Sequence, residues 1–383
     1  MSGLNIALIR QKYTASGGAE RFVAQAMREL AKQGCTVTVV TRQWERTSGQ
    51  AVVELAPAYW GSTWRDWGFA RAVCRHLQTS TYDLVQSHER LECCDVFRAG
   101  DGVHREWLAQ RAQGLSTMRR AAMFMNPHHR YLLHAEQRMF ESPRLRAVIC
   151  NSRMVKDEIL LHYRIDEAKL KVIYNGVDLE AFQPSLRASW RDIIRSKLGI
   201  PNHMLTILHV GSGFERKGVA VLLRAVASAP ITSHFIVLGR DKREPLYRKL
   251  AAKLGIESRV HFMGAQADPK PYYAAADVFA MASLYEPFAN ASMEALAMGL
   301  PVLTSTKSGT AEILENRKTG YVCDARDVAG FAAAIRELAD DGKRLAMGIA
   351  SRRLAERFSL AAMTQQLLQL YERLLSRPAI RDA

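Results

Sequence analysis

Short apolar runs alternate with longer amphipathic stretches along the first half of the chain. Residues 4–10 (LNIALIR) and 36–41 (TVTVVT) are runs of the apolar and β-branched side chains that buried parallel strands contain. Between them, residues 19–34 carry apolar side chains at the spacing of one helix face and end in a glycine. Strand, glycine-containing loop, helix and strand in this order predict a βαβ unit.

The same alternation restarts after a polar stretch at residues 183–203. The run LTILHVGSG at 205–213 predicts a strand that leads into a second glycine-containing loop, and further apolar runs follow with helical stretches between them. The sequence therefore predicts an α/β protein of two doubly wound domains, residues 1–182 and 183–358. We expect residues 359–383 to form a last amphipathic helix that crosses back to the N-terminal domain.

The length of 383 residues suits two such domains, and 48% hydrophobic with 24% charged residues is typical of a globular protein. No apolar run reaches the roughly 18 residues that a membrane-spanning helix needs. The first residues (MSGLNIALIRQ) lack the apolar segment of a secretory signal. We therefore expect the protein in the cytoplasm.

Six cysteines are scattered along the chain without a CxxC pair or ligand-like spacing to histidine. This pattern disfavours a zinc site and a disulfide framework. It predicts reduced thiols that pack as small hydrophobic side chains. The cysteines are Cys35, Cys74, Cys93, Cys94, Cys150 and Cys323.

The chain is basic, with 53 Lys and Arg against 38 Asp and Glu and a formal charge of +15. A cationic surface attracts nucleic acid, anionic lipid or a phosphorylated acceptor. The sequence contains no pattern of an RNA-recognition, KH or helix-turn-helix domain, which disfavours nucleic acid. The basic residues of the N-terminal half form either a solvated face or a surface for the inner membrane, where Trp107, Phe124 and Met125 could insert. They are Arg105, Arg111, Arg119, Arg120, His128, His129, Arg130, His134, Arg138, Arg144 and Arg146.

Two glutamates, Glu286 and Glu294, interrupt the apolar stretch SLYEPFANASMEALAMGLPVLTS. We expect Glu286 on the loop after an apolar strand at 277–283, because the proline that follows it disfavours a helix. Asn290 should cap a helix that carries Glu294 about one turn inside. The backbone N–H groups of residues 289–292 would then point into a ligand cleft.

Two carboxylates that flank the N-terminus of a helix can bind the parts of one ligand. A helix N-terminus suits a phosphate group. A carboxylate just before it can hold sugar hydroxyls, and one a turn inside can hold a ribose diol. The pattern therefore indicates a nucleotide sugar. The alternative is that Glu286 stabilises a loop and Glu294 is a solvated helix residue.

The segment EPFANASMEA resembles the E-x7-E segment of family 4 retaining glycosyltransferases, which have the GT-B fold. Six further segments resemble that family's motifs in the expected order and extend the likeness over nearly the whole chain. Within the family, the likeness is to bacterial lipopolysaccharide core glucosyltransferases. The six segments are GGAERFV, DLVQSHE, ICNSRMVKDEI, VIYNGVDLEAF, VGSGFERKG and GLPVLTSTKSGTAEIL.

The resemblance implies two Rossmann-like domains that face an interdomain cleft, with the donor held by the C-terminal one. It implies that Glu286 contacts the donor sugar, that Glu294 contacts the ribose, and that Arg216 and Lys217 bind the diphosphate and stabilise the departing charge. A solvated loop is the alternative for the two cations. Close backbone approach to the donor is implied for Gly211, Gly213, Phe288, Ala289 and Asn290.

Two positions depart from the family pattern. Ser212 stands where the family often has arginine, and Arg216 could supply that charge instead. Ala289 stands where the family often has glycine, which narrows the space near the phosphates.

The resemblance also implies site residues in the N-terminal domain. Gly17 and Gly18 should let the first loop approach the donor, and His88 should contact the transferring sugar or, alternatively, pack under a loop as a strand-end histidine. Glu20 either touches the acceptor or stabilises the first turn of its helix. The further acceptor candidates are Asp101 and His104. The implied catalytic groups are His88, Glu286, Arg216 and Lys217.

Taken together, the resemblance implies a retaining hexosyltransferase that moves glucose from UDP-glucose to a lipopolysaccharide core or related glycolipid. The enzyme would lie at the cytoplasmic face of the inner membrane, on its anionic surface. Neither a cofactor nor a metal is implied, and the leaving phosphate would accept the acceptor's proton. The alternatives are transfer of another sugar to another glycan, a sugar-nucleotide epimerase of the same fold, and a nucleic-acid-binding protein.

Overall fold

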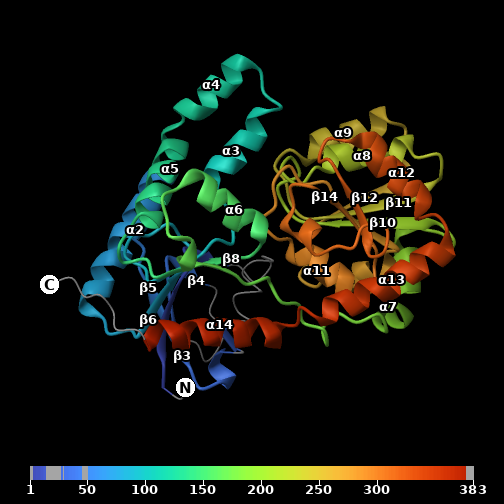
Figure 1. Cartoon of the computed structure of the whole chain (residues 1–383). Coiled ribbons are helices and arrows are strands. Elements are labelled where there is room, and N and C mark those ends of the chain that lie inside the picture. Colours follow the sequence, from blue (N-terminus) through green and yellow to red (C-terminus); the bar gives the residue numbers. More distant parts are fainter. Residues whose placement is uncertain (1–2, 14–26, 29, 45–50, 377–383) are drawn as a thin grey trace. The chain divides into compact units, whose positions relative to one another are not determined.

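The computed structural model of the chain describes residues 3–13, 27–28, 30–44 and 51–376 (Figure 1). The chain divides into two compact units, Met1–Tyr174 with Met363–Ala383, and Asn175–Ala362. Each unit is built on a parallel sheet, which confirms the predicted α/β class. The sequence placed the divisions at 182/183 and 358/359, and the structure divides after Tyr174 and after Ala362.

The first unit contains a seven-stranded sheet in the order β5-β3-β1-β6-β7-β8-β9, and each pair of neighbouring strands in it is parallel. The chain runs outward from β1 through β3 to β5 and then returns to the other side of β1 at β6. The strand order therefore reverses between β1 and β6. The strands are β1 (Asn5–Ile9), β3 (Thr36–Thr41), β5 (Ala51–Glu54), β6 (Leu84–Ser87), β7 (Val96–Arg98), β8 (Ala147–Cys150) and β9 (Leu170–Val172). A separate short pair joins β2 (Lys12–Tyr13) to β4 (Gln43–Trp44).

Helices cover this sheet, and their buried side chains share one core with the strands, for example Phe69, Phe97, Phe140 and Val148. Figure 1 shows α3, α4 and α5 extending away from the sheet of this unit, with α4 at the tip. The last helix belongs largely to this unit, where the Tyr371 hydroxyl donates to Gln86 Oε1 at 2.5 Å. The helices are α2 (Gly61–Thr79), α3 (His104–Ala112), α4 (Thr117–Met125), α5 (Pro127–Phe140), α6 (Arg153–His162) and α14 (Leu360–Leu375).

The second unit contains a six-stranded parallel sheet in the order β12-β11-β10-β13-β14-β15. Here the order reverses between β10 and β13. The strands are β10 (Leu205–Val210), β11 (Ser233–Leu238), β12 (Val260–Gly264), β13 (Val278–Met281), β14 (Val302–Ser305) and β15 (Gly320–Cys323). The helices are α7 (Leu186–Leu198), α8 (Val219–Ser228), α9 (Glu244–Lys253), α10 (Lys270–Ala275), α11 (Asn290–Ala297), α12 (Val328–Glu337) and α13 (Asp341–Glu356).

One disulfide corrects the prediction that every cysteine is a reduced thiol. Cys74 on α2 is bonded to Cys93, which follows β6, although 19 residues separate them. The prediction was wrong because α2 packs over the sheet beside the loop that carries Cys93, a proximity that sequence spacing does not report. The other four cysteines are free thiols, of which Cys35, Cys94 and Cys150 are buried as expected.

Within the described ranges, we find no helix that combines bilayer-spanning length with the apolar character that spanning requires. The predicted helix at 19–34 and its preceding glycine loop lie mainly outside the described residues.

Candidate active site

The candidate site of the second unit lies where its strand order reverses. Ligands of open α/β sheets bind beyond the carboxyl ends of the strands at such a point. Gly211 directly follows β10, and Glu286 follows β13 before α11 begins. The backbone of Glu286 is held on both sides, because its N–H donates to Lys307 O at 2.9 Å and its carbonyl accepts from Gly309 N at 2.9 Å.

The Glu286 side chain binds both predicted cations through one oxygen. Arg216 Nη1 lies 2.9 Å and Lys217 Nζ 2.8 Å from Glu286 Oε2. Burial disfavours the ionised carboxyl group, but the charges of Arg216 and Lys217 outweigh burial and lower the pKa of Glu286 to about 2. Burial lowers the pKa of Lys217, and Glu286 opposes that shift. The alternative of a solvated loop is therefore wrong for Lys217, whose side chain is 12% exposed.

Gly211 makes room for the side chain of Lys217. Its φ is 152°, and a Cβ at this position would lie 2.5 Å from Lys217 Cδ. The glycine after β10 thus allows the buried ammonium group to reach Glu286. Ser212, the first departure from the family pattern, accepts a hydrogen bond from Arg240 N at 3.1 Å. Gly213 has a φ of 80° and open space around its Cα hydrogen.

The start of α11 differs from the prediction. Ala289 is the N-cap residue, without a side-chain cap, and Asn290 is the first residue of the helix. The amide of Asn175 donates instead to Asn290 Oδ1 at 2.6 Å. The expectation that all N–H groups of 289–292 point at a ligand is wrong for two of them, since Ala289 N donates to Thr310 Oγ1 and Ser292 N to Ala289 O. The capping role of Asn290 was inferred from its residue type alone. In the structure, its side chain instead accepts the hydrogen bond from Asn175.

Glu294 lies on α11, as predicted, and Tyr273 orients it. The Tyr273 hydroxyl donates to Glu294 Oε2 at 2.8 Å and is also 3.0 Å from Ala291 O. Tyr273 is fully buried on α10. It was not among the candidates from the sequence, because a tyrosine in an apolar stretch carries no sign of a polar partner 21 residues later. Phe288 and Ala289 are also buried.

In the first unit, His88 follows β6 at the equivalent reversal of strand order. The backbone N–H of His88 donates to Ile9 O at 3.0 Å, and the ring Nε2 of His88 lies 3.3 Å from Gln86 Nε2. Burial, with the charges of Arg10 and Arg98, lowers the pKa of His88 well below its ordinary value, so the ring is neutral at neutral pH.

A small charged cluster adjoins His88. Arg10 Nη1 lies 3.8 Å from Glu89 Oε1 and 3.6 Å from Asp101 Oδ2, and the N–H of Gln11 donates to Glu89 Oε1 at 2.9 Å. Asp101 was predicted, whereas Arg10 and Glu89 were not. The segment DLVQSHE contains Glu89 next to His88 and could have indicated it.

His104 belongs to a different, more buried cluster. The backbone N–H of His104 donates to both carboxylate oxygens of Glu136, at 2.9 and 3.0 Å, and the ring Nε2 of His104 lies 3.1 Å from His129 Nδ1. Burial, with the charge of Arg90, lowers the pKa of His104 to about 3. Gly17, Gly18 and Glu20 lie outside the described residues, so their predicted roles stay predictions. Among the residues that the structure describes, no three His, Cys, Asp or Glu side chains gather in a way that could hold a metal ion.

Comparisons with known proteins define the class. A family model for "Glycosyltransferase Family 4" matches residues 16–181, and one for "Glycosyl transferases group 1" matches residues 191–354. Together they account for both α/β units. The chain belongs with these glycosyltransferases and is a hexosyltransferase of the GT-B type, and retention of anomeric configuration fits the family.

Particular relatives are similar over most of the chain. D-inositol 3-phosphate glycosyltransferase of Corynebacterium glutamicum is 29% identical, over 93% of this chain and 91% of that protein. Lipopolysaccharide glucosyltransferase WaaG of Escherichia coli is 26% identical, over 83% of this chain and 84% of that protein.

Solved structures show the same fold. The crystal structure of WaaG, described as a glycosyltransferase involved in lipopolysaccharide biosynthesis, superposes with a TM-score of 0.84 at 24% identity, over 96% of this chain and 99% of that chain. Anabaena HepE in complex with UDP-glucose superposes with a TM-score of 0.74 at 20% identity, over 97% of this chain and 100% of that chain. The family models and the similarity to lipopolysaccharide glucosyltransferase WaaG, together with this shared fold, confirm the predicted resemblance to a lipopolysaccharide core glucosyltransferase.

Proposed function

We propose that this glycosyltransferase moves glucose from UDP-glucose to a lipopolysaccharide core or related glycolipid at the cytoplasmic face of the inner membrane. The observation that carries the donor part is the grouping of Glu286, Arg216 and Lys217 where the strand order of the second unit reverses. A carboxylate that two cations hold ionised can accept hydrogen bonds from sugar hydroxyls. The same cations can bind a diphosphate and stabilise its charge as it leaves.

Each residue has a role in the proposed reaction. Glu294, held by Tyr273, binds the ribose diol. Arg216 and Lys217 bind the diphosphate, and Glu286 binds the sugar. The bond from the anomeric carbon to the diphosphate oxygen breaks while the acceptor oxygen attacks from the same face, and the acceptor's proton passes to the leaving diphosphate. His88, neutral at neutral pH, would lie against the transferring sugar as a hydrogen-bonding group. No general base from the protein is part of the proposal.

Calorimetric titration tests the donor site. We expect UDP and UDP-glucose to bind in the presence of EDTA, GDP to bind more weakly, and Glu294→Ala to abolish UDP binding. Glu257→Ala, an exposed glutamate on the same unit, is the matched control. Failure of every nucleotide to bind the wild-type protein would exclude the donor site as described.

The membrane part of the proposal rests on α4. Met118, Phe124 and Met125 are 84%, 45% and 74% exposed, and Arg119 and Arg120 are exposed on the same helix. Apolar side chains beside arginines favour the interface of an anionic membrane. Trp107, expected to insert, is half-buried against Leu108 and Met123 and has a packing role instead.

Sedimentation with liposomes tests the membrane part. We expect binding to liposomes that contain phosphatidylglycerol and loss of binding as salt rises. Phe124→Ser together with Met125→Ser should weaken it, whereas Leu161→Ser, an exposed apolar residue on α6, should not. Equal binding to neutral liposomes would argue against the proposal.

A second candidate acceptor is a water-soluble phosphorylated cyclitol or sugar. The similarity to D-inositol 3-phosphate glycosyltransferase favours it. Release of UDP from UDP-glucose in the presence of inositol 3-phosphate, compared with a lipopolysaccharide core acceptor, separates the two. Release that needs neither acceptor would favour an epimerase or hydrolase.

A further inference from the structure

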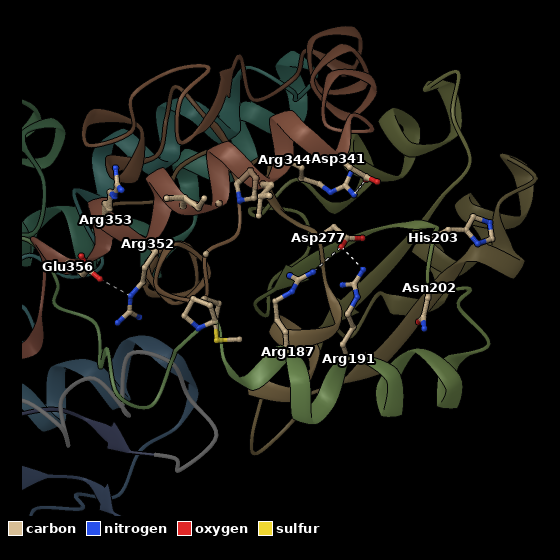
Figure 2. A pocket seen from close by; sticks show the side chains of 17 residues that line it. Arg187, Arg191, Asn202, His203, Asp277, Asp341, Arg344, Arg352, Arg353 and Glu356 are labelled. Carbon is tan, nitrogen blue, oxygen red and sulfur yellow. Dashed lines mark hydrogen bonds and ion pairs between the residues drawn. The ribbon is translucent and has the colours of Figure 1, made fainter.

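A cavity of about 760 Å³, shown in Figure 2, lies in the second unit. Asn202, Asp277 and Pro301 line it, and each of them comes shortly before a strand, β10, β13 or β14. The cavity therefore lies at the amino ends of these strands, whereas Gly211 and Glu286 follow carboxyl ends. It is separate from the candidate donor site.

Positive charge gathers around one carboxylate in this cavity. Asp277 interacts with three guanidinium groups of α7, at 3.3 Å from Arg187 Nη2, 2.8 Å from Arg191 Nη2 and 2.6 Å from Arg195 Nη2. Figure 2 shows Arg187 and Arg191 extending from α7 toward Asp277, with Arg344 on α13 across the pocket. One carboxylate cannot neutralise three cations, so the cluster keeps an excess of about two positive charges.

This excess faces the cavity. Arg195 is fully buried behind Asp277 and donates to several backbone carbonyls, which explains it as a structural residue. Arg187 and Arg191 also donate to one backbone carbonyl each, Ala276 O at 2.8 Å and Ala275 O at 3.2 Å. Unlike Arg195, they keep 33% and 21% of their side chains exposed and line the cavity. Burial lowers the pKa of Arg187, the charge of Arg191 adds to this shift and Asp277 opposes it without cancelling it, so an anion in the cavity would relieve repulsion.

The opposite wall lies on α13 and combines apolar side chains with two ion pairs, Arg344–Asp341 and Arg352–Glu356, each of which is neutral as a pair. Gly348 of α13 meets Gly299 so closely that an added Cβ would lie 2.5 Å from the Gly299 carbonyl oxygen, and this contact seats the helix against the end of α11. On the cavity side of α13, Leu345 and Ile349 lie one turn apart and are 68% and 50% exposed. Met298 completes this wall. The cavity thus pairs a cationic floor with a wall on which apolar side chains lie between ion pairs, and its volume is in the range of small-molecule sites.

We propose that this cavity binds a phosphate monoester with an apolar body, whose dianionic phosphate meets Arg187 and Arg191 and whose apolar part lies on Leu345 and Ile349. A phosphate monoester carries about two negative charges at neutral pH, which balances the excess of the cluster. Such a group occurs on anionic lipids and on free phosphorylated metabolites. The proposal does not depend on the proposed function of the donor site.

Titration calorimetry with dihexanoyl phosphatidic acid, below the concentration at which it forms micelles, tests the proposal on the full chain. We expect saturable binding that Arg187→Gln weakens about tenfold or more, because one charge-assisted contact is lost. Leu345→Gln should weaken it severalfold. The matched controls are Arg224→Gln on α8 and Leu246→Gln on α9, both exposed and outside the cavity, and neither should change it. A melting temperature unchanged from wild type in each variant reports that the unit remains folded.

Further ligands separate the sources of the phosphate. Inorganic phosphate should bind more weakly than the ester, because it lacks the apolar body. Binding of vesicles that contain phosphatidic acid, weakened by Leu345→Gln, supports a lipid headgroup, and binding of the monomeric ester without vesicle binding supports a free metabolite. The proposal is overturned if wild-type protein does not bind the ester, if neither variant weakens binding, or if inorganic phosphate binds equally well.

Discussion

Lys217 Nζ lies 2.8 Å from Glu286 Oε2, although the two residues are 69 positions apart in the chain. The contact joins the loop after β10 to the loop after β13, the two central strands of the sheet. Arg216 shares the same oxygen. The predicted sugar-binding carboxylate and the predicted phosphate-binding cations therefore form one electrostatic unit before any ligand is added.

Replacing Glu286 tests how this unit works. In Glu286→Gln the two cations lose their anionic partner, so we expect UDP binding to persist or strengthen, because the diphosphate becomes their counter-charge. Transfer should fall about 100-fold or more, as for other groups that act on the reacting centre. UDP calorimetry and a UDP-release assay measure the two effects, with Glu257→Gln as the control. Parallel loss of UDP binding and transfer would contradict this division of roles.

The low pKa of Glu286 predicts a dependence of stability on pH. The pKa of Glu286 is lowered from its ordinary value of 4.5, which applies to the unfolded chain, to about 2 in the folded protein. The ionised carboxylate therefore stabilises the folded state at pH values above 4.5, and this stabilisation is lost as the pH falls toward 2. A shift of this size corresponds to a contribution on the order of 3 kcal/mol. Urea unfolding at pH 7, 5, 4 and 3.5 should show a smaller loss of unfolding free energy below pH 4.5 for Glu286→Gln than for wild type. Identical pH profiles would show that the ion pairs do not stabilise the fold.

Tyr273 should position Glu294 for the nucleotide. Tyr273→Phe removes the hydroxyl that donates to Glu294 Oε2. Loss of one hydrogen bond costs about 1 kcal/mol, so UDP binding should weaken about fivefold. Tyr272→Phe, at the neighbouring buried position, is the control and should leave UDP affinity unchanged. A purely structural role for Tyr273 would lower the melting temperature without changing UDP affinity.

Alanine substitutions at two glycines of one loop distinguish the effect of backbone strain from the effect of displacing Lys217. Gly211→Ala places a methyl group 2.5 Å from Lys217 Cδ, whereas Gly213→Ala meets open space and has only the strain of a φ of 80°. Both should lose about 1–2 kcal/mol of unfolding free energy from the left-handed backbone. Gly211→Ala alone should also lose most transfer activity, because Lys217 is pushed away from Glu286. Comparable activity of the two variants would argue against this reason for Gly211.

The Cys74–Cys93 disulfide can be detected by counting free thiols, and its effect on the free energy of unfolding can be measured. In denaturant without reductant, a thiol reagent should report four of the six cysteines, and all six after reduction. Reduction should lower the unfolding free energy by about 3 kcal/mol, because it frees a loop of the unfolded chain. Cys74→Ser should be insensitive to reductant. Six reactive thiols before reduction would show that the bond does not form in the purified protein.

The local pattern of the chain was sufficient for much of this protein. Apolar runs of strand length, amphipathic stretches and the glycines between them predicted two parallel α/β units, since these features depend on neighbours in the sequence. Glu286 and Glu294 could be singled out because one follows a predicted strand and the other lies near the start of a predicted helix, whereas Arg216 and Lys217 were implied by the family resemblance. The paired acids and their family resemblance then indicated a nucleotide sugar.

Contacts between distant segments were outside the reach of that pattern. The sharing of one Glu286 oxygen by Arg216 and Lys217, the support of Glu294 by Tyr273 and the bond between Cys74 and Cys93 each depend on which strands become neighbours. The use of Asn290 as a partner of Asn175 rather than as a helix cap has the same origin. Periodicity reports which face of an element is buried, whereas the partner that a polar side chain finds there is fixed only when the sheet assembles.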